Sequence, residues 1–197
     1  MEFFNFRNEE KSLIRPAKKD DKQFASCLIY DAIDDIALSL TGETEKNKVL
    51  SQLGQFFCED QNRLSYRNTL VKTVDGLPIG IAITYHGKDA YSLDEPIRQH
   101  LLKTNGVKPN IDQEADESDF YLDTLSVNPQ FGGRGYGTEL LNASIQSGKE
   151  LGYHTLSLNV EKSNTKARKL YERIGFTYKK TITIHQHLYD YMVVSLT

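Results

Sequence analysis

The amino-acid sequence predicts an α+β fold built on one mixed, mostly antiparallel sheet of six or seven strands. Strand-like runs rich in β-branched residues recur between residues 12 and 196. Helical patterns, with apolar residues three and four positions apart, lie between them. With 197 residues, 39% of them hydrophobic, the chain is long enough for one sizeable core. We expect an N-terminal leader over residues 1–11 and a single domain over residues 12–197.

Composition and charge exclude several functional classes. The net charge is −3 and no basic stripe dominates, which argues against nucleic-acid binding. The sequence has no apolar run of about 18 residues and no signal-peptide pattern, so we expect a cytoplasmic protein without a membrane partner. Cys27 and Cys58 do not have the spacing of a metal or redox motif, which indicates reduced thiols and no metal site.

The first half of the chain predicts a strand, two helices and a hairpin. Asp20 and Asp21 fit the N-cap of the first helix, and Asp75-Gly76 is a typical hairpin turn. The expected elements are a strand over residues 12–17, helices over residues 20–41 and 45–57, and strands over residues 70–74 and 78–83.

Residues 86–119 are the least regular part of the sequence, and we treat them as an acidic insertion. A short helix is expected over residues 93–102. The segment holds four basic and eight acidic side chains. Two interpretations follow: a solvated loop, or an acidic rim that attracts a cationic ligand.

The second half begins with a strand, a glycine-rich loop and a helix over residues 121–142. Gly132, Gly133, Gly135 and Gly137 surround Arg134 in this loop. Without Cβ atoms the backbone can approach a ligand closely, and the N–H groups of the first helical turn favour an anion. The loop therefore predicts a phosphate cradle, although a flexible surface turn is the alternative.

The remaining elements follow from periodicity and from helix-ending glycines. The loop helix should run over residues 138–151 and be followed by a strand over residues 155–160. Ala167, Leu170, Tyr171 and Ile174 share one face of a further helix, which Gly175 ends. Strands over residues 176–184 and 188–196 should pair at the C-terminus.

The glycine loop matches neither of two common nucleotide motifs. It lacks the Gly-Lys-Ser/Thr ending of a Walker A loop, and its G-x-G-x-G spacing is not the G-x-G-x-x-G of a dinucleotide site. It resembles the Gln/Arg-x-x-Gly-x-Gly/Ala loop of the GNAT N-acetyltransferase superfamily, with Gly135 and Gly137 at the two small positions. Gly132 stands where that family usually has Gln or Arg.

A second segment strengthens the resemblance. Residues 164–176, from Asn164 to Phe176, are similar to the family pattern N-x-x-A-x-x-[LF]-Y-x-x-x-G-F. The resemblance covers about residues 70–197 and implies a three-layer α/β/α fold with a splayed central strand. It also implies acetyl-CoA as the acyl donor. The residues expected to bind it are Leu125, Ser126, Val127, Gly132, Gly133, Arg134, Gly135, Tyr136, Gly137, Thr138, Asn164 and Ala167.

The resemblance also suggests catalytic residues. Tyr171 falls where the family places a general acid, and a phenol with a pKa near 10 stays protonated at pH 7. Asp123 corresponds to a carboxylate that some members use as a base; alternatively it orients the acceptor or pairs with a nearby basic group. Period-two alternation predicts that Asp123 and Tyr121 share a strand face with Leu125 and Val127. His86, His185 and His187 are lesser candidates.

The expected activity is therefore direct transfer of an acetyl group from acetyl-CoA to a primary amine in a ternary complex. By resemblance, the two N-terminal helices line the acceptor side. The acceptor stays open among small molecules and peptides, cationic ones included, as does the choice between a monomer and a homodimer. The alternative is a non-catalytic acyl-CoA-binding sensor with the same fold.

Overall fold

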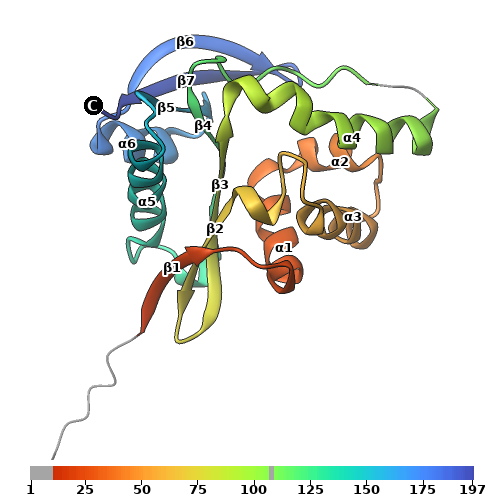
Figure 1. Ribbon diagram of the computed structural model, residues 1–197, viewed down its shortest axis with the longest axis horizontal. Helices are drawn as coiled ribbons and strands as arrows, with labels where there is room; N and C mark the ends of the chain where they lie inside the picture. Colours follow the sequence, from red (N-terminus) through yellow and green to blue (C-terminus); the bar gives the residue numbers. More distant parts are fainter. Residues whose placement is uncertain (1–10, 107–108) are drawn as a thin grey trace, which may run out of the picture.

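A computed structural model describes residues 11–106 and 109–197, and these form three layers around one seven-stranded sheet (Figure 1). The strand order is β1-β2-β3-β4-β5-β7-β6, and within the described chain only β4 and β5 run parallel. This confirms the predicted mixed, mostly antiparallel sheet. The strands are β1 Ser12–Pro16, β2 Thr69–Val74, β3 Leu77–His86, β4 Phe120–Val127, β5 Thr155–Glu161, β6 Thr177–Ile184 and β7 His187–Ser195.

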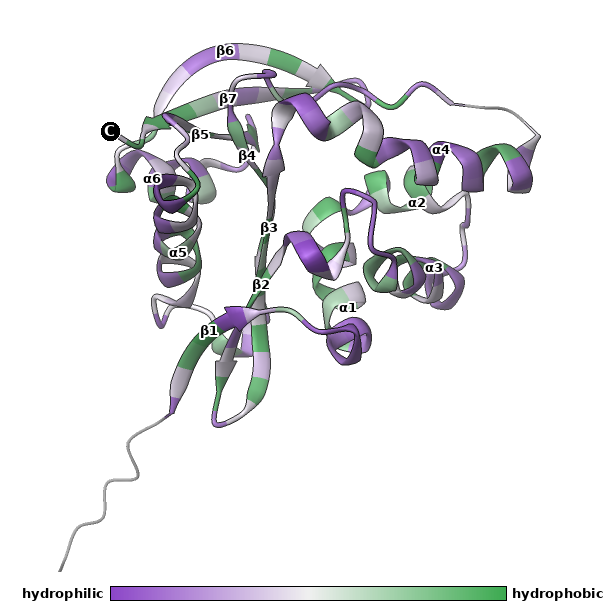
Figure 2. Cartoon of the chain, viewed as in Figure 1, coloured by the Kyte–Doolittle hydropathy of each residue, from purple (hydrophilic) through white to green (hydrophobic). Residues whose placement is uncertain are grey.

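Helices cover both faces of the sheet (Figure 1). One face carries α1 Lys22–Ile33, α2 Asp35–Thr41, α3 Lys46–Cys58 and α4 Ala90–Asn105; the other carries α5 Tyr136–Glu150 and α6 Thr165–Ile174. Each face has its own buried core. Phe56 and Ile81 belong to the first, and Leu122 and Leu140 to the second. Hydrophilic and hydrophobic residues alternate along α4 and α5 (Figure 2), as expected for helices that pack along one side.

Two predicted helices differ from the structure. The helix expected over residues 20–41 is two helices. Asp34 has a φ of 42°, which is outside the helical range, and it interrupts the series of helical hydrogen bonds between α1 and α2. The helix expected over residues 93–102 is longer at both ends, since α4 runs from Ala90 to Asn105 and contains Pro96. Of the predicted leader, residues 1–10 lie outside the described part of the chain.

Of residues 86–119, those that the structure describes are not a solvated loop throughout. Ala115 and Asp119 are buried beside the sheet. The backbone N–H of Gly87 donates to the carbonyl of Asp119 at 2.8 Å. A Cβ atom on Gly87 would lie only 1.9 Å from the backbone oxygen of Asp116. The segment after α4 is therefore packed against the end of β3, and this contact requires glycine.

The sheet opens between β4 and β5, which confirms the predicted splayed strand. The two strands pair only where residues 120–122 of β4 lie beside residues 156–158 of β5. Beyond this point β4 continues to Val127 beside β3, and β5 continues to Glu161 beside β7. Among the strands that the structure describes, none therefore pairs with this edge of β4 over residues 124–127.

A β-bulge lies at the start of this opening. Ile83 of β3 faces Thr124, whereas the next residue of β3 faces Leu122, so Asp123 is an extra residue in β4. The extra residue reverses the alternation of side chains. Tyr121 lies in a cluster beside α4, whereas Leu125 and Val127 pack against the core beneath α5. The expectation that Tyr121, Leu125 and Val127 all share one face with Asp123 is wrong because of this bulge.

Replacing Gly87 with alanine tests the packing of the acidic segment. The new methyl group would overlap a backbone oxygen that cannot rotate away, so we expect Gly87→Ala to reduce the free energy of unfolding by about 1–3 kcal/mol. The measurement is urea unfolding followed by circular dichroism. Gly54→Ala in α3 is the control, because its Cβ would lie 4.0 Å from the Lys22 carbonyl oxygen and from the Ser26 Cβ, which is ordinary contact. An equal effect of both changes would contradict the close approach.

Candidate active site

A cavity of about 160 Å³ lies where the α1–α2 junction faces β4 and β5. Helical side chains such as Ile33 and Leu40 supply its apolar wall. Four carboxylates and one guanidinium supply its charge; these are Asp34, Glu114, Asp123, Glu161 and Arg63. Of the two helices expected on the acceptor side, the first contributes to the lining, whereas α3 packs behind it in the core. The cavity is small, acidic and partly apolar.

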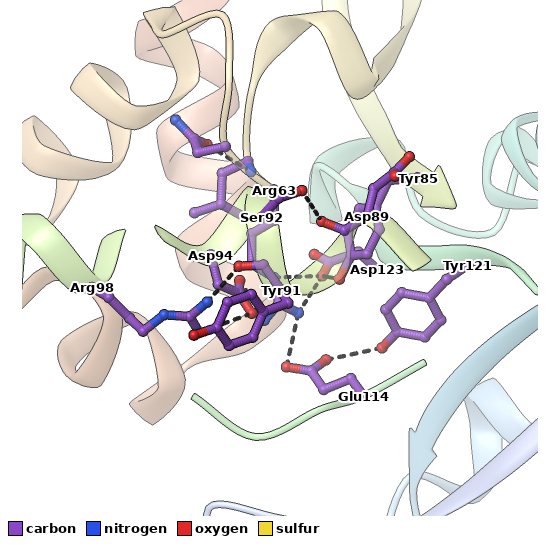
Figure 3. A network of polar contacts seen from close by, with 12 residues as sticks. Arg63, Tyr85, Asp89, Tyr91, Ser92, Asp94, Arg98, Glu114, Tyr121 and Asp123 are labelled. Atoms are coloured by element: carbon purple, nitrogen blue, oxygen red, sulfur yellow. Dashed lines mark hydrogen bonds and ion pairs between the residues drawn. The ribbon is translucent and has the colours of Figure 1, made fainter. Parts of the chain in front are cut away.

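Arg63 is the centre of a buried network of charges (Figure 3). It lies between α3 and β2, and its side chain is 5% exposed. Its guanidinium forms ion pairs with Asp123, with Glu114 at 2.8 Å and with Asp94 at 3.6 Å. Burial opposes the charge on Arg63, but the carboxylates outweigh burial and hold its pKa well above the usual value. Arg63 therefore joins three segments that are far apart in the sequence.

Asp123 projects from the bulge into this network. Its Oδ1 accepts hydrogen bonds from Arg63 Nε at 3.0 Å and from the Tyr85 hydroxyl at 3.0 Å. Its Oδ2 accepts from the Thr124 hydroxyl at 2.9 Å. The side chain is only 3% exposed. The sequence leaves three roles open for Asp123: a base, a group that orients the acceptor and a partner of a nearby basic group. This geometry favours the last of these roles.

The acidic stretch before β4 does not form a free anionic rim. Asp116 pairs with Lys179 and Lys180, and Asp119 accepts a hydrogen bond from the Tyr191 hydroxyl at 2.6 Å. Glu114 is the member of this stretch that lines the cavity. Its Oε1 faces Arg63, and its Oε2 accepts from the Tyr121 hydroxyl at 2.9 Å (Figure 3).

The open edge of β4 presents backbone groups to the gap. Asn128 donates its N–H to the Ile79 carbonyl at 2.8 Å, and the register places these residues opposite each other. Hydrogen-bonded and non-hydrogen-bonded pairs alternate along antiparallel strands. The groups of Ser126 therefore point toward β3, whereas the N–H and C=O groups of Leu125 and Val127 point toward the open edge.

The glycine loop is open and has the backbone that glycine allows. Gly133 and Gly135 have φ values of 77° and 87°, and a Cβ on either would meet nothing within 4 Å. Gly135 is the residue before α5, so the helix N-terminus faces the loop. At Gly132 a Cβ would lie 3.1 Å from the Pro129 carbonyl oxygen, which explains a small residue there. Arg134 is exposed, and its guanidinium lies 5.7 Å from the Phe131 ring centre.

Two side chains fix the start of α5 on the sheet. Tyr136, the first residue of the helix, is buried against Val74 and Ile79. Lys72 of β2 is 2% exposed and forms an ion pair with Glu139 in the first turn. Tyr136 therefore has an anchoring side chain, while Gly137 and Thr138 complete the predicted cradle in the same turn.

The second predicted motif folds as α6. The Asn164 side chain caps this helix by accepting the Ala167 N–H at 3.1 Å. Ala167 and Tyr171 pack against the same core as Leu125 and Val127, which places them on the side of the sheet where α5 lies. Burial raises the pKa of Tyr171 to about 12. No residue of α6 is fully buried, so its apolar face stays partly uncovered.

Other residues differ from their expected importance. No sequence motif points to Arg63, Tyr85 or Asn159. The structure places all three in or beside the network of charges at the cavity. The lesser candidates His86, His185 and His187 do not line the cavity. Within residues 11–106 and 109–197, no group of three histidine, cysteine or acidic side chains is placed to hold a metal ion. The helices in those ranges are too short or too polar to cross a bilayer.

The sequence of this chain is similar to those of known proteins. Residues 53–176 match the model of the acetyltransferase (GNAT) family. The chain is 43% identical over 68 residues to the ribosomal protein bS18-alanine N-acetyltransferase of Haemophilus ducreyi, which covers 34% of this chain and 45% of that protein. It is 34% identical over 102 residues to an uncharacterized N-acetyltransferase of Bacillus subtilis, covering 52% of this chain and 62% of the relative. The chain thus spans less than two thirds of these curated relatives.

Solved structures match over nearly the whole chain. An acetyltransferase crystal structure is 34% identical with a TM-score of 0.80, covering 94% of this chain and 100% of that one. An N-acetyltransferase from Staphylococcus aureus Mu50 is 27% identical with a TM-score of 0.83, covering 92% and 100%. The family match and these full-length likenesses show that the chain belongs to the GNAT acetyltransferase family.

Proposed function

We propose that this protein transfers an acetyl group from acetyl-CoA to a primary amine by direct attack in a ternary complex. The observation that carries the proposal is the opening between β4 and β5: β4 continues from it to the glycine loop, and Asp123 and Asn159, on the two diverging strands, line the acidic cavity. Holding the thioester and the amine together would supply much of the rate acceleration. The similarity to N-acetyltransferases supports this reaction class.

The residues along the opening fit acyl-CoA in chemistry and shape. The N–H groups of residues 133–138 would hold the pyrophosphate at the positive end of α5, with Arg134 beside it. The free N–H and C=O groups of Leu125 and Val127 would pair with the amides of the pantetheine arm, as a neighbouring strand would. Such N–H groups can also polarise the thioester carbonyl.

Tyr171 would protonate the leaving thiolate. Its pKa of about 12 keeps the phenol protonated at neutral pH, so it has a proton to give. Its hydroxyl is not committed to a side chain of the described residues. Ala167, one turn earlier on the same face, and Asn164 at the cap would border the pantetheine. Asp123 would hold the acceptor side in place through Arg63.

The acceptor would be a compact amine that carries positive charge. Four carboxylates against one guanidinium attract cations, and the aliphatic wall from α1 and α2 suits an alkyl stem. An exposed amino terminus of a peptide and a small alkyl diamine both have this chemistry. One relative is a ribosomal protein bS18-alanine N-acetyltransferase, which supports including an alanine-containing peptide among the acceptors tested.

Blocking the cradle should weaken acetyl-CoA binding. Gly135→Val places a branched side chain at a φ of 87°, so the loop must change shape, and we expect the dissociation constant to rise at least tenfold. Calorimetry with acetyl-CoA measures this. Gly76→Val is the matched control, because Gly76 has a φ of 81° in the β2–β3 turn outside the site. Unchanged affinity in Gly135→Val would refute the cradle.

Removing the phenol oxygen should stop turnover but leave binding intact. We expect Tyr171→Phe to lower kcat by about 100-fold or more, since general acids typically contribute 10²–10⁴-fold. The assay is free-thiol release from acetyl-CoA with 1,4-diaminobutane, an alanine-initiated peptide and an aminoglycoside as acceptors. Tyr178→Phe, at an exposed position on β6, is the control.

The same panel separates the enzyme from the sensor. Tight acetyl-CoA binding without release of thiol above the rate in buffer, for every acceptor, would favour a non-catalytic acyl-CoA sensor. Full activity of Tyr171→Phe at every pH would show that the general acid lies elsewhere.

A further inference from the structure

The carboxylates of Glu114 and Asp123 both form ion pairs with Arg63, but their surroundings differ. Asp123 is 3% exposed, and both of its oxygens accept hydrogen bonds from the surrounding side chains. Glu114 is 12% exposed, and within the described part of the chain each of its oxygens has one partner, Arg63 on Oε1 and Tyr121 on Oε2. A carboxylate oxygen can accept more than one hydrogen bond. Glu114 therefore keeps capacity for a ligand, and it lines the cavity.

Asn159 supplies a second acceptor in the same place. Its amide nitrogen donates to the Glu114 carbonyl and to the Tyr121 hydroxyl, both at 2.9 Å. The Tyr121 hydroxyl already gives its proton to Glu114, so both neighbours of the amide nitrogen are acceptors. This fixes the orientation of the amide. Asn159 Oδ1 is then buried with no donor among the described residues, although Asn159 lines the cavity.

A buried acceptor without a partner costs free energy, and a ligand that brings N–H groups would remove that cost. A primary ammonium brings three such donors on one small atom. The Glu114 carboxylate and the Asn159 oxygen could both accept from it. A neutral group with two N–H or O–H donors could also bond to both, but only a cation in addition complements the charge of the carboxylate.

We propose that Glu114 binds the ammonium of the acceptor and receives its proton, with Asn159 orienting the same group. This rests on the proposed acetyl transfer. One N–H bond of the ammonium breaks and an O–H bond forms on Glu114, and the electron pair stays on nitrogen. That pair forms the C–N bond at the acetyl carbon as the C–S bond breaks, and the Tyr171 hydroxyl protonates the sulfur. The nitrogen then loses its second proton, which restores the Tyr171 phenol, and Glu114 releases the first proton to solvent. The acidic insertion thus supplies the base.

The charges around Glu114 suit this role. Burial raises the pKa of its carboxyl, the Arg63 guanidinium lowers it, and the Asp123 carboxylate raises it, with an upward net direction. A higher pKa makes a carboxylate a better proton acceptor. Polar and charged groups from each element packed around Glu114 surround its carboxylate. They are Arg63, Tyr121 and Asp123 of β4, Tyr85 of β3, Asp94 of α4, Asn159 of β5 and Tyr189 of β7.

The test is the pH profile of Glu114→Gln. The wild type needs ionised Glu114 and the ammonium form of the acceptor, so its kcat/KM should fall as the pH drops through the raised pKa and stay level between that pKa and the pKa of the acceptor. The variant can use only acceptor that is already neutral. At pH 7 we expect kcat/KM to fall about 100-fold. Below the pKa of the acceptor, the deficit should then shrink about tenfold per pH unit, because the neutral fraction grows at that rate.

The acceptor is the amine of the panel that the wild type acetylates fastest, and acetyl-CoA affinity and thermal unfolding are followed in parallel. Glu117→Gln, at an exposed position of the same segment outside the cavity lining, is the matched control. Asn159→Leu should raise KM for the amine more than it lowers kcat. Full activity of Glu114→Gln, or a deficit that is constant with pH, would overturn the role of Glu114 and leave the transferase intact. Inactivity of the wild type toward all amines would overturn both.

Discussion

The separation of β4 from β5 is the constraint on which the rest of this structure depends. Backbone N–H and C=O groups inside a protein require partners, and a sheet normally provides them. Here a short parallel contact of residues 120–122 with residues 156–158 joins two halves of the sheet, which then diverge. Leu125 and Val127 are left with backbone groups facing the gap. A ligand with amides of its own can complete the sheet, and α5 and α6 are positioned beside the same strand end.

The buried Arg63 network defines the other side of the opening. It connects Asp123 at the bulge, Glu114 after α4 and Asp94 within α4. These three residues are not neighbours in the sequence. Burial raises the pKa of Asp94 to about 6, which shows how strongly this region resists charge. Buried ion pairs add little net stability, but removal of one partner leaves an uncompensated charge. Arg63 therefore fixes the geometry of the acceptor side more than it stabilises the fold.

The parts of the site that the sequence predicted depend on local signals. Gly133 and Gly135 need positive φ, and the helical spacing from Asn164 to Tyr171 specifies one face, so both segments could be read from neighbouring residues. The missed parts depend on tertiary contacts. A bulge at Asp123 leaves no mark in composition, and it reverses which side chains share a face. Arg63 lies in an irregular connection, where an arginine is normally solvated.

The most direct measurement is a crystal structure of the protein with CoA. The pantetheine arm should lie between β4 and β5, hydrogen-bonded to the backbone of Leu125 and Val127, with the pyrophosphate on the N–H groups that precede and begin α5. Its sulfur should point toward Tyr171 and toward the cavity that holds Glu114. CoA bound on another surface, with the strand opening left empty or closed, would contradict the central claim that the diverging strands form the acyl-CoA site.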